Sequence, residues 1–589
     1  MKLSKRLTNT IACFLLLFVF LICLFSMKDD SATMDELAHL PAGFSYLTQQ
    51  DMRLNPEHPP LIKDLAALPI LFIKGIKFPE NIKAWQSDIN GQWEFGSYFL
   101  YKIGNPVDKI LFLARIPMVL VLIALGFYVF KWAKELSGNK VALLALFLFS
   151  FSPTLLAHGR LVTTDVGATA GIFIATYYFL KALKVPTKRN IFLAGISFGL
   201  AQLAKFTTFL LVPFFGFLVI VWIVLKENKG KRDKLKLFGS YILRFLIILG
   251  IGFFIVWAFY LFHVLNYPPE RQARDIEFLL SSHPIRFLGP LLGKCAKVPI
   301  VRAIVQYLFG LALVYQRAIG GHTTYFLGEV SAAGWKNYFP IVYLIKEPLT
   351  FHILSVLALF LVALKIKRPF WQDFPKRSFC WIRNHFPEFS MISFVLLYWI
   401  LSLTSHLNIG VRHLLPVFPF TILLVSRSIG DWLKPPYLKL KYFFLAILIC
   451  WQIISVLSIY PHFLAYFNEI VGIENGYLYT VNSNLDWGQD LKRLTEWVAK
   501  NNIEKIYVDY FGGGDAKYYL KEKFMPWWGT RPEKEFEKPN YLAVSVTFLQ
   551  GGRGRPAPGF DQPSGYYLWL NKYTPVAKIG YSIFVYYIE

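Results

Sequence analysis

The sequence predicts an α-helical polytopic membrane protein that ends in an α/β domain outside the membrane. The chain has 589 residues, 55% of them hydrophobic, and its mean hydropathy of +0.43 is too high for a soluble protein with an ordinary surface. About eleven apolar stretches of roughly 13 to 24 residues approach the length that crosses a hydrocarbon core of about 30 Å. No such run follows residue 460.

The apolar stretches divide the chain into a membrane module at residues 1–460 and a tail at 461–589. They begin near Ile11, Ile110, Val141, Val166, Ile191, Phe206, Tyr241, Pro348, Met391, Leu414 and Tyr442. Large loops separate some of them, at residues 26–109 and 266–347. We interpret a further apolar stretch, at 303–318, as an interfacial helix, because counting it as a span would reverse the sidedness of all that follows.

The positive charge is concentrated in alternate segments between the apolar stretches. The net charge is +25, which alone would fit nucleic-acid binding, but six alternate inter-span segments hold 26 Lys and Arg against six Asp and Glu. These segments are residues 1–7, 131–140, 181–190, 226–236, 365–388 and 427–441. We therefore expect a multi-pass protein of the cell (inner) membrane, with these segments cytoplasmic, the large loops and the tail extracytoplasmic, and no nucleic-acid partner.

The tail is long enough to form a small α/β domain. Asp486 is placed to cap a helix that carries Leu491, Leu494 and Trp497 at helical spacing. Three runs have the composition of strands: residues 505–511, 541–549 and 583–588. The glycines at 512–514 lack the G-x-G-x-x-G spacing of a dinucleotide site, so we interpret them as an ordinary loop.

Two groups of polar residues follow the first span. Asp35, Glu36 and His39 lie within one or two helical turns of each other; acids also favour helix starts for the dipole alone. The sequence Asn-Pro-Glu-His-Pro-Pro-Leu occupies residues 55–61 and presents Glu57 and His58 from a loop stiffened by prolines. Such prolines also suit a simple turn between surface helices.

Further polar residues lie at the same expected face. The turn at 158–165 holds Arg160 and Asp165, although Asp165 would also serve as an ordinary helix cap. Lys205, His406, Arg412 and His413 lie at ends of later spans, where a cation can simply reach the interface. Together these cations suit an anionic head group.

These motifs resemble the GT-C membrane glycosyltransferases of the protein O-mannosyltransferase and aminoarabinose transferase type. The Asp-Glu pair at 35–36, the motif at 55–61 and Asp165 after the third span carry the resemblance. The aminoarabinose transferases have Glu-Lys-Pro-Pro-Leu in the second motif, so His58 takes the lysine position here. Residues 484–491, Asn-Leu-Asp-Trp-Gly-Gln-Asp-Leu, look like a segment that recurs in bacterial relatives with an outer C-terminal domain.

The resemblance implies a glycosyltransferase that moves a hexose or pentose from a polyprenyl-phosphate donor to a hydroxyl of a protein, lipid or glycan at the outer face. It implies inverting single displacement with Asp35 as general base, assisted by Glu36 and Asp165. Substrate contacts are expected from Glu57, His58, Arg160, Lys205, Arg412 and His413. A good phosphate leaving group needs positive charge more than acid catalysis.

A divalent metal is a further possibility, because some members of this family bind one near these carboxylates. Glu57 and His263 are the first candidate ligands, and His39, His58 and Asp165 are also suitable types. No metal-binding spacing is visible in the sequence. The cofactor prediction is therefore no certain group and a possible divalent metal.

Two functions of other classes compete. A transporter or lipid flippase should place ionisable residues and broken helices at mid-membrane, often in two matching halves, whereas the acids here follow the ends of spans. A binding module on a passive anchor would need one span and not about eleven.

Overall fold

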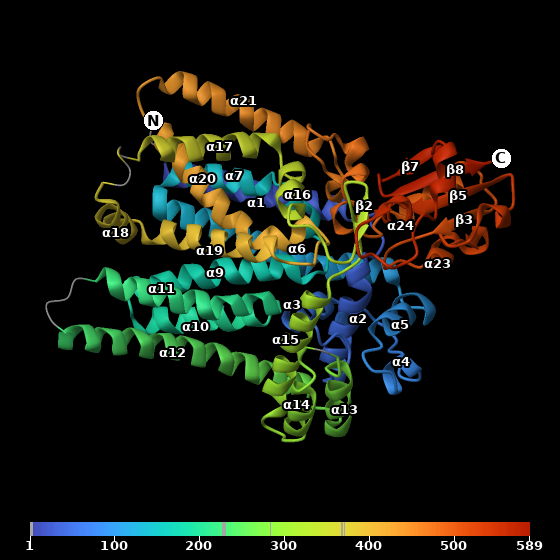
Figure 1. Ribbon diagram of the computed structural model, residues 1–589, viewed down its shortest axis with the longest axis horizontal. Helices are drawn as coiled ribbons and strands as arrows, with labels where there is room; N and C mark the ends of the chain where they lie inside the picture. Colours follow the sequence, from blue (N-terminus) through green and yellow to red (C-terminus); the bar gives the residue numbers. More distant parts are fainter. Residues whose placement is uncertain (1–3, 227–230, 283, 367–368, 370–371) are drawn as a thin grey trace.

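The computed structural model describes residues 4–226, 231–282, 284–366, 369 and 372–589. Residues 1–3, 227–230, 367–368 and 370–371, which belong to three of the expected cytoplasmic segments, lie outside the described residues. Figure 1 shows a bundle of long helices with a smaller domain, containing most of the strands, at one end. This arrangement confirms the predicted fold class.

Nine helices in the described residues are long and apolar enough to cross a membrane. They are α1 (Lys5–Ser26), α6 (Val107–Ser137), α9 (Thr164–Lys184), η3 with α11 (Phe206–Leu210 and Leu211–Leu225), α12 (Lys231–His263), α15 (Arg302–Gly320), α19 (Phe386–Leu403), η4 with α20 (Val411–Val417 and Phe418–Trp432) and α21 (Leu438–Leu457). The pair α16 (Tyr338–Lys346) and α17 (Leu349–Leu364), bent by 113°, gives a tenth if it is counted as one span.

Two of the expected spans are shorter than the sequence pattern indicated. Helix α7 (Asn139–Ser150) has 12 residues and is followed by α8 (Pro153–His158), and α10 (Lys188–Gln202) has 15 residues. Helix α15 passes the length test, yet Figure 1 shows it lying across the end of the bundle rather than along it. The interfacial interpretation of this helix stays a prediction.

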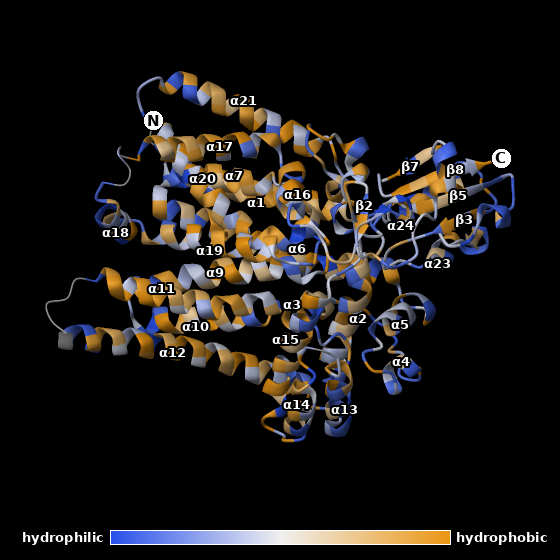
Figure 2. Ribbon diagram, viewed as in Figure 1, coloured by the Kyte–Doolittle hydropathy of each residue, from blue (hydrophilic) through white to orange (hydrophobic). Residues whose placement is uncertain are grey.

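The bundle has two chemically different ends. One end of the bundle in Figure 1 holds α18 (Phe374–Asn384), the C-terminal end of α11, the start of α12 and the connection between α20 and α21, and the C-terminal domain lies at the other end. Figure 2 shows hydrophobic residues along the bundle helices and hydrophilic residues in the loops at both ends. The expected cytoplasmic loops thus share one end, and which end faces the cytosol stays a prediction.

Short helices pack over the end that bears the C-terminal domain. They are α2 (Met34–Gln49), α3 (Leu61–Ala67), η1 (Leu68–Phe72), α4 (Lys83–Gln86), α5 (Gln92–Ser97), η2 (Tyr98–Lys102), α13 (Pro269–Leu279) and α14 (Leu288–Ala296). The apolar faces of α2 to η2 share one core with the adjacent ends of α6, α12 and α15, which includes Tyr46, Leu111, Tyr260 and Tyr307. Helices α13 and α14 form a separate core with α15, which includes Ile276, Leu292 and Phe309. The first of these cores holds the 26–109 loop rigidly against the bundle.

The C-terminal domain is built on a five-stranded sheet with the order β4-β3-β5-β8-β7. The strands are β3 (Ile506–Asp509), β4 (Phe524–Pro526), β5 (Asn540–Ser545), β7 (Ala577–Ile579) and β8 (Ile583–Ile588). Strand β3 is parallel to β4 and β5, whereas β5 and β7 are antiparallel to β8. The predicted strands at 505–511 and 583–588 are confirmed as β3 and β8. The predicted strand at 541–549 is confirmed only as far as Ser545, because residues 546–549 begin helix α24.

Both faces of this sheet are covered. Alternate residues point to opposite faces, so Tyr507 and Leu542 belong to one core cluster and Ile506 and Ala543 to another. The helices of the tail are α22 (Leu491–Lys500), α23 (Ala516–Leu520) and α24 (Val546–Arg553), with 3₁₀ turns η5 (Phe463–Ala465), η6 (Ile473–Leu478), η7 (Asn482–Asn484), η8 (Lys521–Lys523), η9 (Glu533–Glu535) and η10 (Leu568–Lys572).

The expected cap of α22 is wrong. The residue before this helix is Asp490, and Asp486 is instead fully buried, where its Oδ2 accepts a hydrogen bond from the Thr547 backbone N–H at 2.9 Å. The chain turns between Asp486 and Asp490 to pack against the first outer loop, which the local helical pattern cannot reveal.

A second, smaller sheet joins the tail to the loop between α15 and α16. Strands β1 (Thr324–Phe326) and β2 (Glu329–Ser331) form a hairpin, and β6 (Arg555–Pro556) of the tail pairs in parallel with β2. Tyr325 and Val330 also belong to the core on one face of the large sheet. The tail therefore shares both backbone pairing and core packing with the membrane module.

Candidate active site

Asp35 lies in the first turn of α2, at the end of the bundle that bears the C-terminal domain. The helix begins with a capping box, in which the Thr33 backbone N–H donates to Glu36 Oε2 at 2.9 Å. This cap fixes the helix phase, so that the two adjacent acids point in different directions. The Asp35 side chain is 23% exposed, whereas that of Glu36 is 0% exposed.

Four charged side chains from four parts of the chain form one ion cluster. Arg412 Nη1, from η4, donates to Asp35 Oδ2 at 2.7 Å and to Asp165 Oδ2 at 3.2 Å. Lys205, which precedes η3, donates from Nζ to Asp165 Oδ1 at 2.5 Å. The cluster thus joins residues separated by up to 377 positions in the sequence.

The cluster keeps Asp35 ionised. Burial alone would raise the pKa of this carboxyl, but the charges of Arg412 and His39 and the hydrogen bond from Arg412 hold it below its usual value. A carboxylate at neutral pH is able to accept a proton. Asp165 also faces Asp35, and its negative charge opposes part of this effect.

The cluster forms part of the wall of a cavity of about 320 Å³. The lining includes six of the residues singled out from the sequence: Asp35, Glu57, His58, Lys205, Arg412 and His413. Asp165 lies behind them through its ion pairs, and Thr164 lines the cavity beside it. The rest of the lining is largely apolar and includes Leu210, Val314, Phe339 and Leu401.

The 55–61 loop brings Glu57 and His58 to this cavity. Glu57 accepts hydrogen bonds from Gln92 Nε2 at 2.6 Å and from Asn90 Nδ2 at 3.3 Å. The His58 ring meets the His39 ring edge to face at 4.9 Å. Burial, helped by the charges of His39 and Lys205, lowers the pKa of His58 well below its usual value, so this ring is neutral at pH 7.

Lys63, which the sequence analysis missed, holds the loop in place. Its buried Nζ donates to Tyr46 Oη and Asn55 O, both at 2.9 Å, to Asn55 Oδ1 at 3.0 Å and to His58 O at 2.8 Å. No sequence signal distinguishes this lysine from one on a surface helix, since its acceptors are backbone and side-chain oxygens brought together by the fold.

Arg317 is a second residue that the sequence analysis missed. It lies near the C-terminal end of α15, lines the cavity and is exposed. No hydrogen bond or ion pair joins it to another described residue. The interfacial assignment of this helix offered a signal, because a cation at the end of such a helix lies at head-group depth.

Three sequence candidates are placed away from the cavity. Glu36 is enclosed by Arg115, whose Nε and Nη2 donate to its two oxygens at 2.8 and 2.6 Å, and by the Val162 N–H at 3.0 Å. Arg160 pairs with Asp30 at 3.1 Å and is buried. His406, not among the cavity residues, lies near Gly321.

The two first metal-ligand candidates do not meet. His263 Nε2 lies 2.8 Å from Asp64 Oδ2, and His263 Nδ1 lies 2.7 Å from Phe259 O, so both ring nitrogens have hydrogen-bond partners. Glu57 instead accepts hydrogen bonds from Asn90 and Gln92. Within the described ranges no group of three or more His, Cys, Asp or Glu is arranged to hold a metal ion. Glu57 and His263 therefore do not fit a shared metal site.

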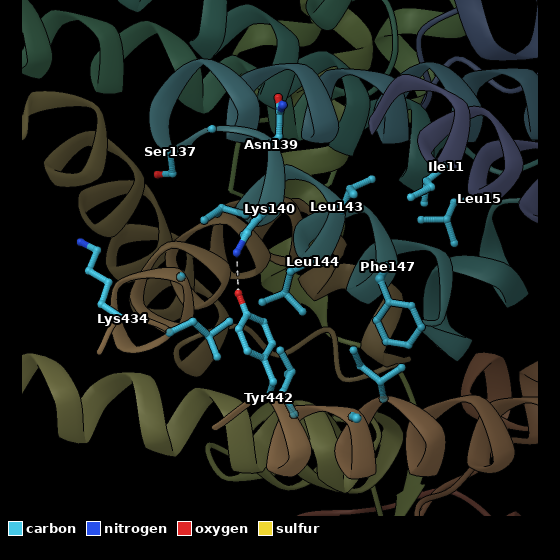
Figure 3. A pocket seen from close by; sticks show the side chains of 17 residues that line it. Ile11, Leu15, Ser137, Asn139, Lys140, Leu143, Leu144, Phe147, Lys434 and Tyr442 are labelled. Atoms are coloured by element: carbon cyan, nitrogen blue, oxygen red, sulfur yellow. Dashed lines mark hydrogen bonds between the residues drawn. The ribbon is translucent and has the colours of Figure 1, made fainter. Parts of the chain in front are cut away.

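A larger hollow lies at the other end of the bundle. It measures about 1300 Å³, and Figure 3 shows its lining from α1, α7, α20 and α21, with the Lys140 Nζ donating to Tyr442 Oη at 2.7 Å. Its lining includes Leu15, Leu144 and Phe147 but no carboxylate. It offers no base for acyl, phosphoryl or glycosyl transfer, so the smaller cavity is the candidate active site.

The fold and the cavity define a polytopic membrane protein with an ionic site at one end of its helix bundle. Residues 97–257, which run from α5 to α12 and include Asp165 and Lys205, match the family model "Dolichyl-phosphate-mannose-protein mannosyltransferase". This match confirms the resemblance to GT-C membrane glycosyltransferases that the motifs indicated. A comparison with curated protein sequences finds no match.

Solved structures of three membrane transferases are similar. The S. cerevisiae protein O-mannosyltransferase Pmt1-Pmt2 complex bound to the sugar donor shares 16% identity over 45% of this chain and 35% of that chain, with a TM-score of 0.33. ArnT from Cupriavidus metallidurans bound to undecaprenyl phosphate shares 13% identity over 98% and 97%, with a TM-score of 0.29. Archaeal oligosaccharyltransferase AglB from Archaeoglobus fulgidus shares 12% over 94% and 71%, with a TM-score of 0.45. At these TM-scores, the likenesses assign no role to any residue of this chain.

Proposed function

We propose that this protein transfers a sugar from a polyprenyl-phosphate donor to a hydroxyl acceptor at the outer face of the cell membrane. The observation that carries the proposal is the cluster of Asp35, Asp165, Lys205 and Arg412 in the wall of one cavity at the end of the bundle. The family match over residues 97–257 supports a lipid-phosphate-linked sugar as donor.

The shape of the cavity suits such a donor. The lining combines charged residues of the cluster with the apolar side chains of Leu210, Val314, Phe339 and Leu401. A polyprenyl phosphate has an anionic head and an apolar chain, so the two kinds of lining residue match the two parts of the molecule. The cavity also lies at the end of membrane-length helices, where an isoprenoid chain can remain in lipid.

The proposed reaction is an inverting single displacement. Asp35 accepts the proton of the acceptor hydroxyl while the acceptor oxygen bonds to the anomeric carbon of the sugar. The bond between that carbon and the phosphate oxygen breaks, and its electrons leave with the polyprenyl phosphate. The lowered pKa of Asp35, set by burial against the stronger attraction of Arg412 and His39, keeps the base ionised but makes it weak. A phosphate leaving group reduces the need for a strong one.

Charge balance supports a proposed phosphate contact by Arg317 and His413. Lys205 and Arg412 are already neutralised by the two carboxylates of the cluster. Arg317 has no such partner among the described residues, so it adds an uncompensated positive charge to the cavity. His413, whose Nε2 is buried without a hydrogen-bond partner in the described part of the chain, is a further donor for a phosphate oxygen.

The rival transporter or flippase predicts a different product. Purified protein in liposomes would be given polyprenyl phosphate that carries a radiolabelled hexose or pentose, together with a detergent extract of envelope acceptors. We expect label on an acceptor and an equal amount of free polyprenyl phosphate, and neither product with the Asp35→Asn variant. Movement of intact donor between leaflets without release of polyprenyl phosphate would contradict the proposal.

The orientation is tested separately. The excess of Lys and Arg at the end opposite the cavity supports an extracytoplasmic site. A cysteine introduced at Asp29, which is exposed in the segment before α2, in a variant whose five native cysteines are replaced, should react with a membrane-impermeant maleimide added to intact cells lacking an outer membrane barrier. Labelling only after lysis would place the site in the cytosol.

A further inference from the structure

Residues 484–491 of the tail lie against the start of α2. The Met34 N–H donates to Trp487 O at 3.0 Å, and the Ser31 N–H donates to Gln489 O at 2.9 Å. Ser31 Oγ donates in turn to Gly488 O at 2.7 Å. The helix turn that carries Asp35 is therefore hydrogen-bonded to this segment of the C-terminal domain.

The same segment also holds the residues that precede and include η4. The Val411 N–H donates to Asn484 Oδ1 at 2.8 Å, and Ser483 Oγ donates to Ile409 O at 2.5 Å. Asn484 is itself fixed, because its Nδ2 donates to Tyr338 Oη at 2.9 Å. Arg412 thus follows directly after a backbone group that the tail holds.

Trp487 contacts Arg412 itself. The guanidinium carbon of Arg412 lies 4.1 Å from the centre of the indole ring, and the ring is 1% exposed. Arg412 Nη1 donates to both carboxylates, and the buried Nε of Arg412 has no hydrogen-bond partner among the described residues. The indole face is therefore what fixes the plane of a guanidinium whose edge holds the two acids.

The backbone at this position requires glycine after Trp487. Gly488 has φ +97°, and a Cβ there would lie 2.4 Å from Gly512 Cα. The turn presses the tail loop at 512–514 onto the first outer loop, where the Gly513 N–H donates to Ala32 O at 3.2 Å. These contacts fix the position of the Trp487 indole ring relative to the cluster.

We propose that Trp487 is a positioning residue of the active site, and that the C-terminal domain completes the site by setting the orientation of Arg412 and, through it, of Asp35 and Asp165. This inference rests on the proposed function and assigns the 484–491 motif a role in it. The domain is then a component of the transferase centre and not a separate binding module.

The test is a double-mutant cycle between Trp487→Leu and Arg412→Gln, measured as kcat for sugar transfer. In the wild-type background we expect Trp487→Leu to lower kcat about five- to thirty-fold, and Trp487→Phe to restore part of the loss because it keeps an aromatic face. With Arg412→Gln present, Trp487→Leu should lower kcat by less than about twofold more, because its partner is gone.

The matched control is Trp527→Leu. Trp527 is 3% exposed in the core of the same domain and also lies under an arginine, with Arg531 Cζ 4.5 Å from its ring centre. Any effect of this variant should be the same with Arg412 or Gln at position 412, since the sites are independent. Wild-type kcat in Trp487→Leu, or equal losses in both backgrounds, would overturn the inference.

The same cycle measured as melting temperature separates this inference from the proposed function. If wild-type protein transfers no sugar, the proposed function has failed, and the contact is then decided by stability. We expect the melting-temperature effects of Trp487→Leu and Arg412→Gln to be non-additive, and those of Trp527→Leu and Arg412→Gln to be additive. Additivity in both cycles contradicts the positioning role.

Discussion

Asp35 and Glu36 are neighbours in one helical turn, yet they belong to different regions of the molecule. Asp35 faces a cavity and shares Arg412 with Asp165. Glu36 is sealed inside the protein, where Arg115 and backbone N–H groups satisfy both of its oxygens. The cavity cluster borders space for a substrate, whereas the Glu36 side chain is 0% exposed. An acid pair in a motif therefore need not be a pair of catalytic acids.

The largest effect is expected from removing the cavity acid. Asp35→Asn keeps the shape of the side chain but removes the base, so we expect kcat to fall by about 10² to 10⁴, with a melting temperature close to that of the wild type. Asp29→Asn, which changes an exposed acid of the same loop, should keep full activity. An Asp35→Asn variant that is folded and fully active would remove the distinction between the two regions.

The scaffold acid should show the opposite result. Glu36→Gln leaves the Arg115 guanidinium buried without its counter-charge, a change that typically costs about 3 to 5 kcal/mol. We expect a large fall in melting temperature, while the folded fraction retains kcat within about tenfold. Replacing both partners, as Glu36→Gln with Arg115→Met, should recover part of the stability, because no buried charge is then left unpaired. A loss of activity without a loss of stability would make Glu36 catalytic after all.

A third prediction concerns binding in the cavity rather than chemistry. Arg317→Gln removes the cation that has no counter-charge among the described residues, and we expect the KM for the polyprenyl-phosphate donor to rise about tenfold with little change in kcat. Arg286→Gln removes an exposed arginine between α13 and α14 that does not line the cavity, and serves as the charge-matched control. A change in acceptor KM alone would contradict the assignment of Arg317 to the donor phosphate.

The smallest effect on stability is expected at Asp486, a buried acid with no cationic partner among the described residues. Burial raises the pKa of Asp486 to about 7, from 3.8. The folded state therefore binds a proton more tightly than the unfolded state, and this group's contribution to stability is full below about pH 4 and declines as the pH rises to about 7. Asp486→Asn should remove that decline, so its melting temperature should exceed that of the wild type by about 2 to 4 °C at pH 8 but not at pH 4. An equal difference at both pH values would refute the titration.

The sequence predicted most of the fold and most of the charged residues of the cavity. Membrane-length apolar runs and loop charges are local signals, and the bundle and its two ends followed from them. Asp35, Lys205, Arg412 and His413 were found near the ends of apolar runs, and Glu57 was found in the proline-rich loop. The short lengths of α7 and α10 were missed because neighbouring apolar residues extend beyond the helix ends. Glu36 was grouped with Asp35 because nothing local reveals the distant Arg115.

Lys63 and the role of Trp487 were missed for the same physical reason. Lys63 and Trp487 act through contacts that exist only once distant segments meet: Trp487 is hydrogen-bonded to Met34 and stacked on Arg412. Such contacts leave no periodicity and no spacing in the sequence. The motif at 484–491 was visible as a motif, but its geometry had to come from the fold.

The small β1-β2-β6 sheet limits where this protein can be divided to make chimaeras. Its strands come from the loop after α15 and from the far end of the tail. A chimaera that exchanges the tail at residue 461 between two such proteins would separate β6 from its hairpin and Trp487 from its arginine together. A chimaera made to exchange specificity between relatives must therefore take the β1–β2 loop and the tail from the same parent.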